Sequence, residues 1–311
     1  MKVHRVTSLH PLKNPVMSIG IFDGAHKGHA AVFERVRQRA AEFEGESVIV
    51  TFWPHPRIVL GKESEKLKLL TTLEEKQDLI SRHGIDHLFV LPFTREFARL
   101  PACGFVKQCL VDGGRLAHLV FGFNHHFGHG REGNFENLKT CARLYNFTLE
   151  QLDPVTEHGI RISSSVIREA LCRGQVRLAS ALLSYHYSLQ GTIVGGKQVG
   201  RVIGFPTANV LPDEKKKLIP GDGVYAVKVS LGDDTFPGMM NIGFRPTISG
   251  QNEKKSIEVH IFDFSENVYD HRVNISFIDR IRDEKKFENL DRLRDQLEKD
   301  KTEALRILSE V

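Results

Sequence analysis

At 311 residues the chain is too long for one ordinary compact core, and its length fits two domains. Hydrophobic residues at 41% and charged residues at 26% lie in the normal globular range, which argues against a disordered or membrane-resident protein. The net charge of +4 fits an enzyme with anionic substrates and is weak evidence for nucleic-acid binding, which usually requires a concentrated basic stripe.

The first half of the chain alternates short apolar runs with helical patterns. The apolar runs predict strands at residues 16–22, 47–52, 85–91, 117–122 and 147–152. Helical patterns lie between them, at residues 28–43, 72–83, 105–111 and 135–145. Strands separated by helices predict a doubly wound, Rossmann-like α/β domain, in which ligands bind beyond the carboxyl ends of the strands.

From residue 164 the pattern becomes two helices that end near residue 183, and the chain then changes character. Short β-rich segments follow at residues 187–194, 223–229, 239–242, 256–264 and 272–278. Such strands without intervening helices predict an antiparallel β-barrel, and an amphipathic helix closes the chain. We therefore expect an α/β domain over residues 1–183 and a β-barrel domain with a C-terminal helix over residues 184–311.

Targeting and cysteine patterns predict a soluble cytoplasmic protein. The first residues lack the apolar stretch of a signal peptide, and no run of about 18 apolar residues occurs. The four cysteines show neither paired metal spacing nor a dense framework, so we expect reduced, mostly buried thiols. They are Cys103, Cys109, Cys141 and Cys172.

Residues 20–29 read Gly-Ile-Phe-Asp-Gly-Ala-His-Lys-Gly-His, where the first long apolar strand turns into a helix. Small residues let the backbone approach a ligand closely, and a helix N-terminus favours negative charge. The imidazoles of His26 and His29 can then donate to phosphate oxygens as charge develops during phosphoryl transfer. Half a metal site, or two ordinary surface histidines, are the alternatives for a lone His-x-x-His pair.

This segment resembles the Gly-x-Phe-Asp-Gly-x-His-x-Gly-His signature of the nucleotidyltransferase module of bacterial bifunctional riboflavin kinase/FAD synthetases. Residues 162–168, Ile-Ser-Ser-Ser-Val-Ile-Arg, are similar to the second signature of that superfamily. Hydroxyls at a helix start suit a triphosphate. The same serines also form an ordinary N-cap, which does not exclude binding. The resemblance implies ATP binding by Gly20, Phe22, Asp23, Gly24, His26, His29, Ser163, Ser164, Ser165 and Arg168, with His26 and His29 acting in adenylyl transfer.

Two further segments are similar to the flavin side of this module. Residues 51–56 match its Thr-Phe-x-Pro-His-Pro segment, and residues 122–128 match its Gly-x-Asp/Asn-x-x-Phe-Gly segment. The resemblance implies flavin contacts by Pro54, His55, Pro56, Asn124 and Phe127. The polar residue of the second segment is often Asp, whereas this chain has Asn124. The alternative is therefore an enzyme in which only the kinase is active and the first domain is a degenerate flavin-binding module.

The second half resembles riboflavin kinase over nearly its whole length. Residues 191–201 look like its glycine-rich phosphate loop, although a glycine-rich segment alone is more often a hairpin. Residues 204–209, Gly-Phe-Pro-Thr-Ala-Asn, match its most diagnostic motif. The resemblance implies ATP binding by Gly195, Gly196, Lys197, Gly200, Arg201, Pro206, Thr207 and Asn209. Thr207 and Asn209 would also hold Mg²⁺, and such neutral oxygen ligands leave the charge of the ion for the phosphates.

The same resemblance implies that Glu258 is the catalytic base of the kinase. The 5′-hydroxyl of riboflavin must lose a proton, whereas the phosphate of FMN is already anionic, so only the kinase reaction benefits from a carboxylate. A solvent-facing residue on an alternating strand is the alternative for Glu258. The flavin contacts implied in this domain are Asn241, Arg245, Arg282, Glu284 and Phe287.

These patterns predict a bifunctional enzyme with ATP, riboflavin and FMN as substrates and Mg²⁺ as cofactor. One domain phosphorylates riboflavin to FMN, and the other adenylylates FMN to FAD with release of pyrophosphate. We expect no nucleic acid, membrane or obligatory protein partner. The alternative from another class is a flavin-sensing or RNA-binding protein on the same scaffold, which would show salt-dependent RNA affinity without turnover.

Overall fold

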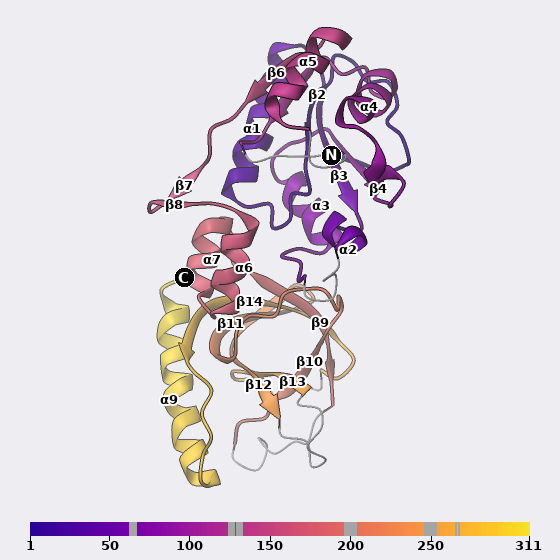
Figure 1. Cartoon of the computed structure of the whole chain (residues 1–311). Coiled ribbons are helices and arrows are strands. Elements are labelled where there is room, and N and C mark those ends of the chain that lie inside the picture. The colour runs from indigo at the N-terminus through magenta and orange to yellow at the C-terminus, as the bar shows by residue number, and fades with distance from the viewer. Residues whose placement is uncertain are drawn as a thin grey trace. The chain divides into compact units, whose positions relative to one another are not determined.

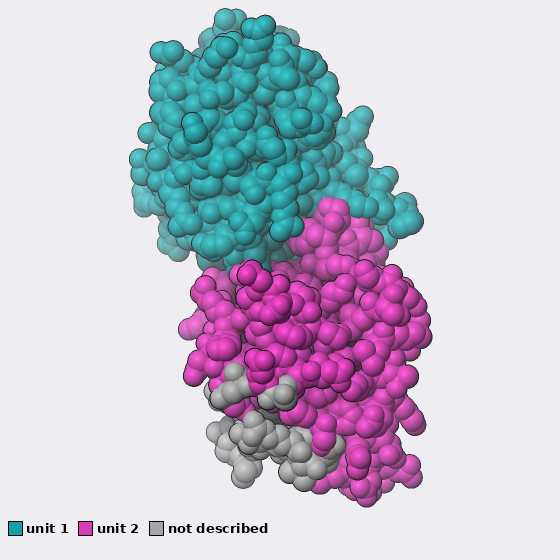
Figure 2. Space-filling view, turned by 180° about the vertical axis from the view of Figure 1, so that it is seen from behind, with its two compact units in different colours: residues 1–164 teal, residues 165–311 magenta. Residues whose placement is uncertain are grey.

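The computed structural model describes residues 1–61, 67–123, 128, 133–195, 204–245, 254–264, 266 and 268–311. The chain divides into two compact units, residues 1–164 and 165–311, which Figure 2 shows in different colours. Helices α6 (Ser164–Cys172) and α7 (Val176–Leu183) pack with the second unit, where the Gly221 amide donates to the carbonyl of Leu171 over 2.8 Å. The functional boundary at residues 183/184 therefore stays a prediction.

The first unit contains a six-stranded parallel sheet in the order β1–β4–β3–β2–β5–β6 (Figure 1). Its strands are β1 (Lys2–Arg5), β2 (Val16–Ile19), β3 (Ser47–Trp53), β4 (His87–Pro92), β5 (His118–Phe121) and β6 (Thr148–Gln151). The strand order reverses between β2 and β5, and the loops after these strands therefore lie where doubly wound sheets bind ligands. The predicted Rossmann-like fold is confirmed.

Helices cover both faces of this sheet. On one face, α1 (Lys27–Glu42) and α3 (Leu73–Ser81) bury apolar side chains against it. On the other face pack α4 (Ala102–Phe105), the π-helix η2 (Val106–Gly113) and α5 (Phe135–Tyr145). Because both faces are covered, the four inner strands, β2 to β5, are largely apolar. The remaining elements of the unit are α2 (Pro56–Leu60), η1 (Phe97–Arg99), β7 (Thr156–Glu157) and β8 (Ile160–Arg161).

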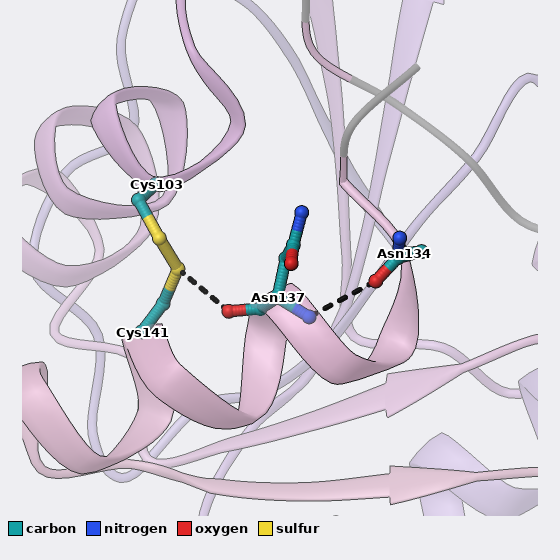
Figure 3. The surroundings of a disulfide bond; sticks show 4 residues. All are labelled: Cys103, Asn134, Asn137 and Cys141. Atoms are coloured by element: carbon teal, nitrogen blue, oxygen red, sulfur yellow. Dashed lines mark hydrogen bonds between the residues drawn. A yellow bond between two sulfur atoms is a disulfide. The ribbon is translucent and has the colours of Figure 1, made fainter.

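A disulfide joins two of the helices on the second face (Figure 3). It links Cys103 of α4 to Cys141 of α5, whose Cα atoms lie 5.8 Å apart. The sulfur of Cys141 also lies 3.3 Å from the carbonyl oxygen of Asn137, one turn earlier in α5. The expectation of reduced thiols is therefore wrong for this pair. The sequence did not reveal the pairing because the two residues are 38 positions apart and only the fold brings them together. Cys109 is a buried free thiol and Cys172 an exposed one.

The second unit is a closed antiparallel barrel in the strand order β10–β13–β12–β11–β14–β9 (Figure 1). The strands are β9 (Ser188–Val194), β10 (Ala208–Pro212), β11 (Gly223–Leu231), β12 (Asp234–Arg245), β13 (Lys254–Ile261) and β14 (Arg272–Arg282). Helix α9 (Leu290–Ser309) buries Ala304 and Ile307 against the barrel, next to Met239 and Ile278. The predicted barrel with a C-terminal helix is confirmed. Within the described residues, no helix is both long and apolar enough to cross a membrane.

A histidine buried in the first unit makes its stability depend on pH. His118 is 5% exposed, and burial, assisted by Arg39, lowers its pKa although Glu150 opposes this shift. The unfolded chain therefore binds a proton more readily, with a pKa of about 6.5. The stability that neutral His118 contributes is present above that value and is lost as the pH falls from there through the lower folded-state pKa.

We expect the urea midpoint of the first unit to decrease as the pH is lowered from about 7 to about 5. Urea unfolding followed by circular dichroism at several pH values measures this effect. In a His118→Gln variant the decline should be shallower, because glutamine does not titrate. A decline as steep as that of the wild type would show that other groups cause it.

Candidate active sites

The turn between β2 and α1 has a backbone that most side chains avoid. Phe22, Gly24 and Ala25 have positive φ angles of 50°, 88° and 36°. Gly20 is required because a Cβ there would lie 2.6 Å from the ring of Phe22. Backbone conformations of this kind cost energy and cluster at functional sites, so the turn is a candidate site on its conformation alone.

The two histidines of this turn lie together at the N-terminus of α1. His26 is the N-cap, and its Nδ1 accepts the backbone N–H of His29 over 3.3 Å. The two rings stack with centroids 3.6 Å apart, and His26 is only 6% exposed. The N-terminus of a helix carries positive potential and amide donors, so this pair lies where an anionic phosphate would bind.

Asp23 ties the turn to the segment that precedes α3. Its carboxylate is 3% exposed and accepts the backbone N–H groups of Leu70 and Thr71, each over 3.1 Å. The hydroxyl of Thr71 in turn accepts the N–H of Gly24 over 3.1 Å. In these bonds the Asp23 side chain supports the shape of the turn.

The second signature reaches the same turn through one hydroxyl. Ser164 donates from Oγ to the carbonyl of Asp23 over 2.9 Å, and Ser163 precedes it in the first unit. Ser165 and Arg168 lie in α6 and belong to the second unit, so their predicted contacts with ATP stay predictions. The structure thus brings Gly20, Phe22, Asp23, Gly24, His26, His29 and Ser164 together.

Lys76 is a charged residue near this turn that sequence analysis missed. It is 2% exposed on α3, and its Nζ lies 5.7 Å from the centroid of the Trp53 ring. Burial lowers its pKa to about 8, although the charge of Asp23 opposes the shift. Helical periodicity predicts an apolar residue at such a position, so only the fold reveals it.

The predicted flavin side of this unit follows β3. His55 is the N-cap of α2, where its Nδ1 accepts the N–H of Arg57 over 3.1 Å, and Pro56 occupies the first helical turn. Pro54 follows Trp53, the last residue of β3, at the carboxyl edge of the sheet that β2 also reaches. Asn124 and Phe127 lie outside the described residues.

Basic side chains hold the β7–β8 hairpin in the same unit, and neither of them was a predicted site residue. Lys27 at the start of α1 forms an ion pair with Glu157 over 2.9 Å. The guanidinium of Arg161 lies 4.5 Å from the centroid of the Phe123 ring, and Phe123 is 45% exposed. The hairpin therefore contacts both the start of α1 and the loop after β5.

In the barrel, strand register gathers the predicted kinase residues. Glu258 of β13 pairs with Asn209 of β10 on one side and with Asn241 of β12 on the other. Residues directly opposite in neighbouring antiparallel strands point to the same face. The Oγ1 of Thr207 donates to the Glu258 carboxylate over 3.2 Å. Three predicted site residues therefore lie side by side on three adjacent strands, and Thr207 joins them from the residue just before β10.

The rest of the predicted phosphate loop is only partly described. Gly195 follows Val194, which pairs with Asn209, so the loop starts beside the gathered residues. Pro206 accepts a hydrogen bond at its carbonyl from Nδ1 of the buried His260 over 2.7 Å. Gly196, Lys197, Gly200 and Arg201 lie outside the described residues, and Arg245 is the last residue of β12.

Arg282, predicted to contact flavin, forms a bidentate ion pair with Asp300 of α9. Its Nε and Nη2 donate to the carboxylate oxygens over 2.9 and 2.7 Å, and Asp300 is 1% exposed. The Phe287 ring lies 5.7 Å from the guanidinium. Glu284 packs on Gly243, where any Cβ would overlap its carboxylate. Asp300, which fixes the start of the loop that follows β14, lies in none of the sequence motifs.

Asp300→Ala should lower the free energy of unfolding of the second unit by about 3 kcal/mol, because it leaves the mostly buried guanidinium of Arg282 without its carboxylate partner. Urea unfolding followed by circular dichroism measures the effect. Asp295→Ala, on the exposed side of the same helix, is the matched control and should leave the midpoint unchanged. Equal midpoints in the two variants would contradict the role of this ion pair.

Comparison with known proteins covers nearly the whole chain. The family model described as FAD synthetase matches residues 9–166, and the one described as riboflavin kinase matches residues 183–308. The bifunctional riboflavin kinase/FMN adenylyltransferase of Bacillus subtilis (strain 168) is 38% identical over 315 residues, which cover 99% of both chains. The protein of the same name from Escherichia coli (strain K12) is 35% identical over 94% of this chain and 93% of its own.

One solved structure is similar over the whole chain as well. It is described as a macrolide-efflux protein from Streptococcus pneumoniae and has a TM-score of 0.84 and 31% identity. The match covers 96% of this chain and 98% of that one. The fold seen here is therefore shared with an experimentally determined structure.

Proposed function

Because this chain belongs to the family of bifunctional riboflavin kinases/FMN adenylyltransferases, we propose a division of labour between the residues of its two sites. The protein is an enzyme that makes FMN from riboflavin and ATP in its C-terminal domain. Its N-terminal domain transfers AMP from a second ATP to FMN, which gives FAD and pyrophosphate.

In adenylyl transfer, the histidine pair stabilises the phosphates of ATP. His26 and His29 lie at the N-terminus of α1, where imidazole and amide donors meet the charge that develops as the FMN phosphate attacks the α-phosphorus. No general base is needed because the attacking phosphate is already anionic. The remaining ATP contacts are Gly20, Phe22, Asp23, Gly24, Ser163, Ser164, Ser165 and Arg168. The stacked pair at the helix N-terminus is the observation that carries this assignment.

In riboflavin phosphorylation, Glu258 accepts the proton of the 5′-hydroxyl. Its hydrogen bond from Thr207 fixes the carboxylate beside the start of β10, where Asn209 lies in register with it. Neutral hydroxyl and amide oxygens next to a carboxylate fit the preference of Mg²⁺ for oxygen ligands, so Thr207 and Asn209 would hold the ion. When bound there, Mg²⁺ would neutralise phosphate charge. The other ATP contacts are Gly195, Gly196, Lys197, Gly200, Arg201 and Pro206.

Flavin binds each domain through a separate set of residues. In the N-terminal domain the set is Pro54, His55, Pro56, Asn124 and Phe127. In the C-terminal domain it is Asn241, Arg245, Arg282, Glu284 and Phe287. The ion pair with Asp300 holds Arg282 in place. Arg282 in turn fixes the start of the loop that carries Glu284 and Phe287.

The functional domains span residues 1–183 and 184–311, and the protein works in the cytoplasm on small molecules. It requires no nucleic acid or protein partner. Chromatographic analysis of products from riboflavin and Mg·ATP tests the central assignment, with FMN expected first and FAD afterwards. Incubation of FMN with Mg·ATP, with detection of pyrophosphate, isolates the second step. FMN without any FAD would instead support a kinase with an inactive first domain.

A further inference from the structure

The roles assigned above leave the buried lysine beside the phosphate turn unused. Lys76 is 2% exposed in the first turn of α3, so its ammonium is shielded from solvent and from a bound substrate. Its Nζ lies 5.7 Å from the ring centroid of Trp53, the last residue of β3. A buried ammonium is costly unless an opposite charge compensates it.

Asp23 provides that opposite charge. Its carboxylate is 3% exposed, and it accepts the N–H groups of Leu70 and Thr71 just before α3 begins. Among the charged groups of the described chain, Asp23 acts most strongly on Lys76 and raises its pKa against the effect of burial. The lysine, the aspartate and the start of α3 therefore form one buried cluster beneath the turn.

Other titratable groups of the described residues near the cluster have separate tasks. On α3 itself, Glu75 accepts the Thr72 N–H over 2.9 Å in the capping box. From β3, Trp53 contributes a neutral ring. The turn contributes His26 and His29, which stack on each other.

We propose that Lys76 is a positioning residue for adenylyl transfer: its ammonium neutralises Asp23 and prevents a net negative charge from lying beneath the ATP phosphates. The inference rests on FMN adenylylation by the first domain. When the ammonium loses its proton, the pair carries one negative charge, which repels the triphosphate. Lys76 therefore controls the KM for ATP in FAD synthesis more than kcat.

The charge of Lys76 changes within an accessible pH range. Burial lowers its pKa to about 8, so the ammonium is charged below that value and neutral above it. We expect the KM for ATP in FMN adenylylation to rise about tenfold between about pH 7 and pH 9. Riboflavin phosphorylation by the same chain is the internal reference. Its KM for ATP should not show a rise with this midpoint that the Lys76 variants remove.

Two variants and one optical signal test the proposal on the full-length enzyme. Lys76→Met removes the charge at every pH, so its KM for ATP should be high at pH 7 and should not rise further. Lys76→Arg keeps the charge, so its KM should stay low across the range. Lys139→Met replaces an exposed lysine of the same unit and should behave as the wild type. Trp53 is the single tryptophan of the chain, and its fluorescence should show a transition near pH 8 that both Lys76 variants lack.

Several results would overturn the proposal. A Lys76→Met variant with the wild-type KM, or with the alkaline rise intact, would assign the effect to a group other than Lys76. If Lys76→Met does not fold, the wild-type titration still decides, because a flat KM or an absent fluorescence transition near pH 8 contradicts the proposal. A wild-type enzyme that makes no FAD at any pH would refute the reaction itself, which is a distinguishable failure.

Discussion

Glu258→Ala is expected to slow riboflavin phosphorylation by about 100- to 10,000-fold, the usual contribution of a general base. The riboflavin hydroxyl is a weak nucleophile, and Glu258 is the carboxylate that Thr207 and the register with Asn209 hold at this site. FMN adenylylation should remain near the wild-type rate, because that reaction takes place in the other domain. Initial rates of FMN formation from riboflavin, and of FAD formation from added FMN, measure the two effects separately.

Two further variants sharpen this result. Glu258→Gln keeps the size of the side chain and can still accept the Thr207 hydrogen bond, but it cannot take up the proton, so it should be as slow as the alanine variant. Glu298→Ala removes an exposed carboxylate of α9 and should leave both rates unchanged. Equal loss of both activities in Glu258→Ala would contradict the division of labour, and an active glutamine variant would contradict the role of Glu258 as base.

His29→Ala is expected to have the opposite effect, slowing FAD formation from FMN by about 100-fold or more. The imidazole lies at the N-terminus of α1, stacked on His26, and we propose that the negative charge of adenylyl transfer develops there. Riboflavin phosphorylation should be retained, and circular dichroism should show an intact fold. Pyrophosphate release from FMN and Mg·ATP measures the loss.

The matched control for this variant is His271→Ala, which removes an exposed histidine of the barrel unit. Its rates of FMN and FAD formation should equal those of the wild type. Unchanged FAD synthesis in His29→Ala would refute the phosphate-binding role of the pair.

The architecture was predictable where both faces of a strand are buried. Strands β2 to β5 are continuous apolar runs because helices cover them on both sides, so the pattern alone finds them. Strand β1 was missed, since Lys2–Arg5 contains a single apolar residue, Val3, which is 41% exposed at the edge of the sheet. Strand β10 was missed because its first two residues, Ala208 and Asn209, were interpreted only as the end of a phosphate-binding motif.

The candidate sites could be predicted from the sequence where their residues form a local motif. The His26–His29 pair and the Thr207–Asn209 segment are short patterns, and the structure gathers their partners around them. Lys76 and Asp300 could not be found in this way. Each is a buried charge compensated by a residue far away in the sequence, and a charge on a helix is otherwise expected to face solvent.

The bond between Cys103 and Cys141 makes a closed ring of the chain segment that contains Asn124 and Phe127. Closing a ring of this size lowers the conformational entropy of the unfolded chain. In the chain-entropy model this raises the free energy of unfolding by about 4 kcal/mol. Exchange with an external dithiol would reduce the two cysteines, oxidise that dithiol to its own disulfide and return this freedom to the chain. In the described residues the barrel unit holds no such ring. The half that makes FAD therefore has a folding stability linked to the redox poise of its surroundings, whereas the half that makes FMN does not.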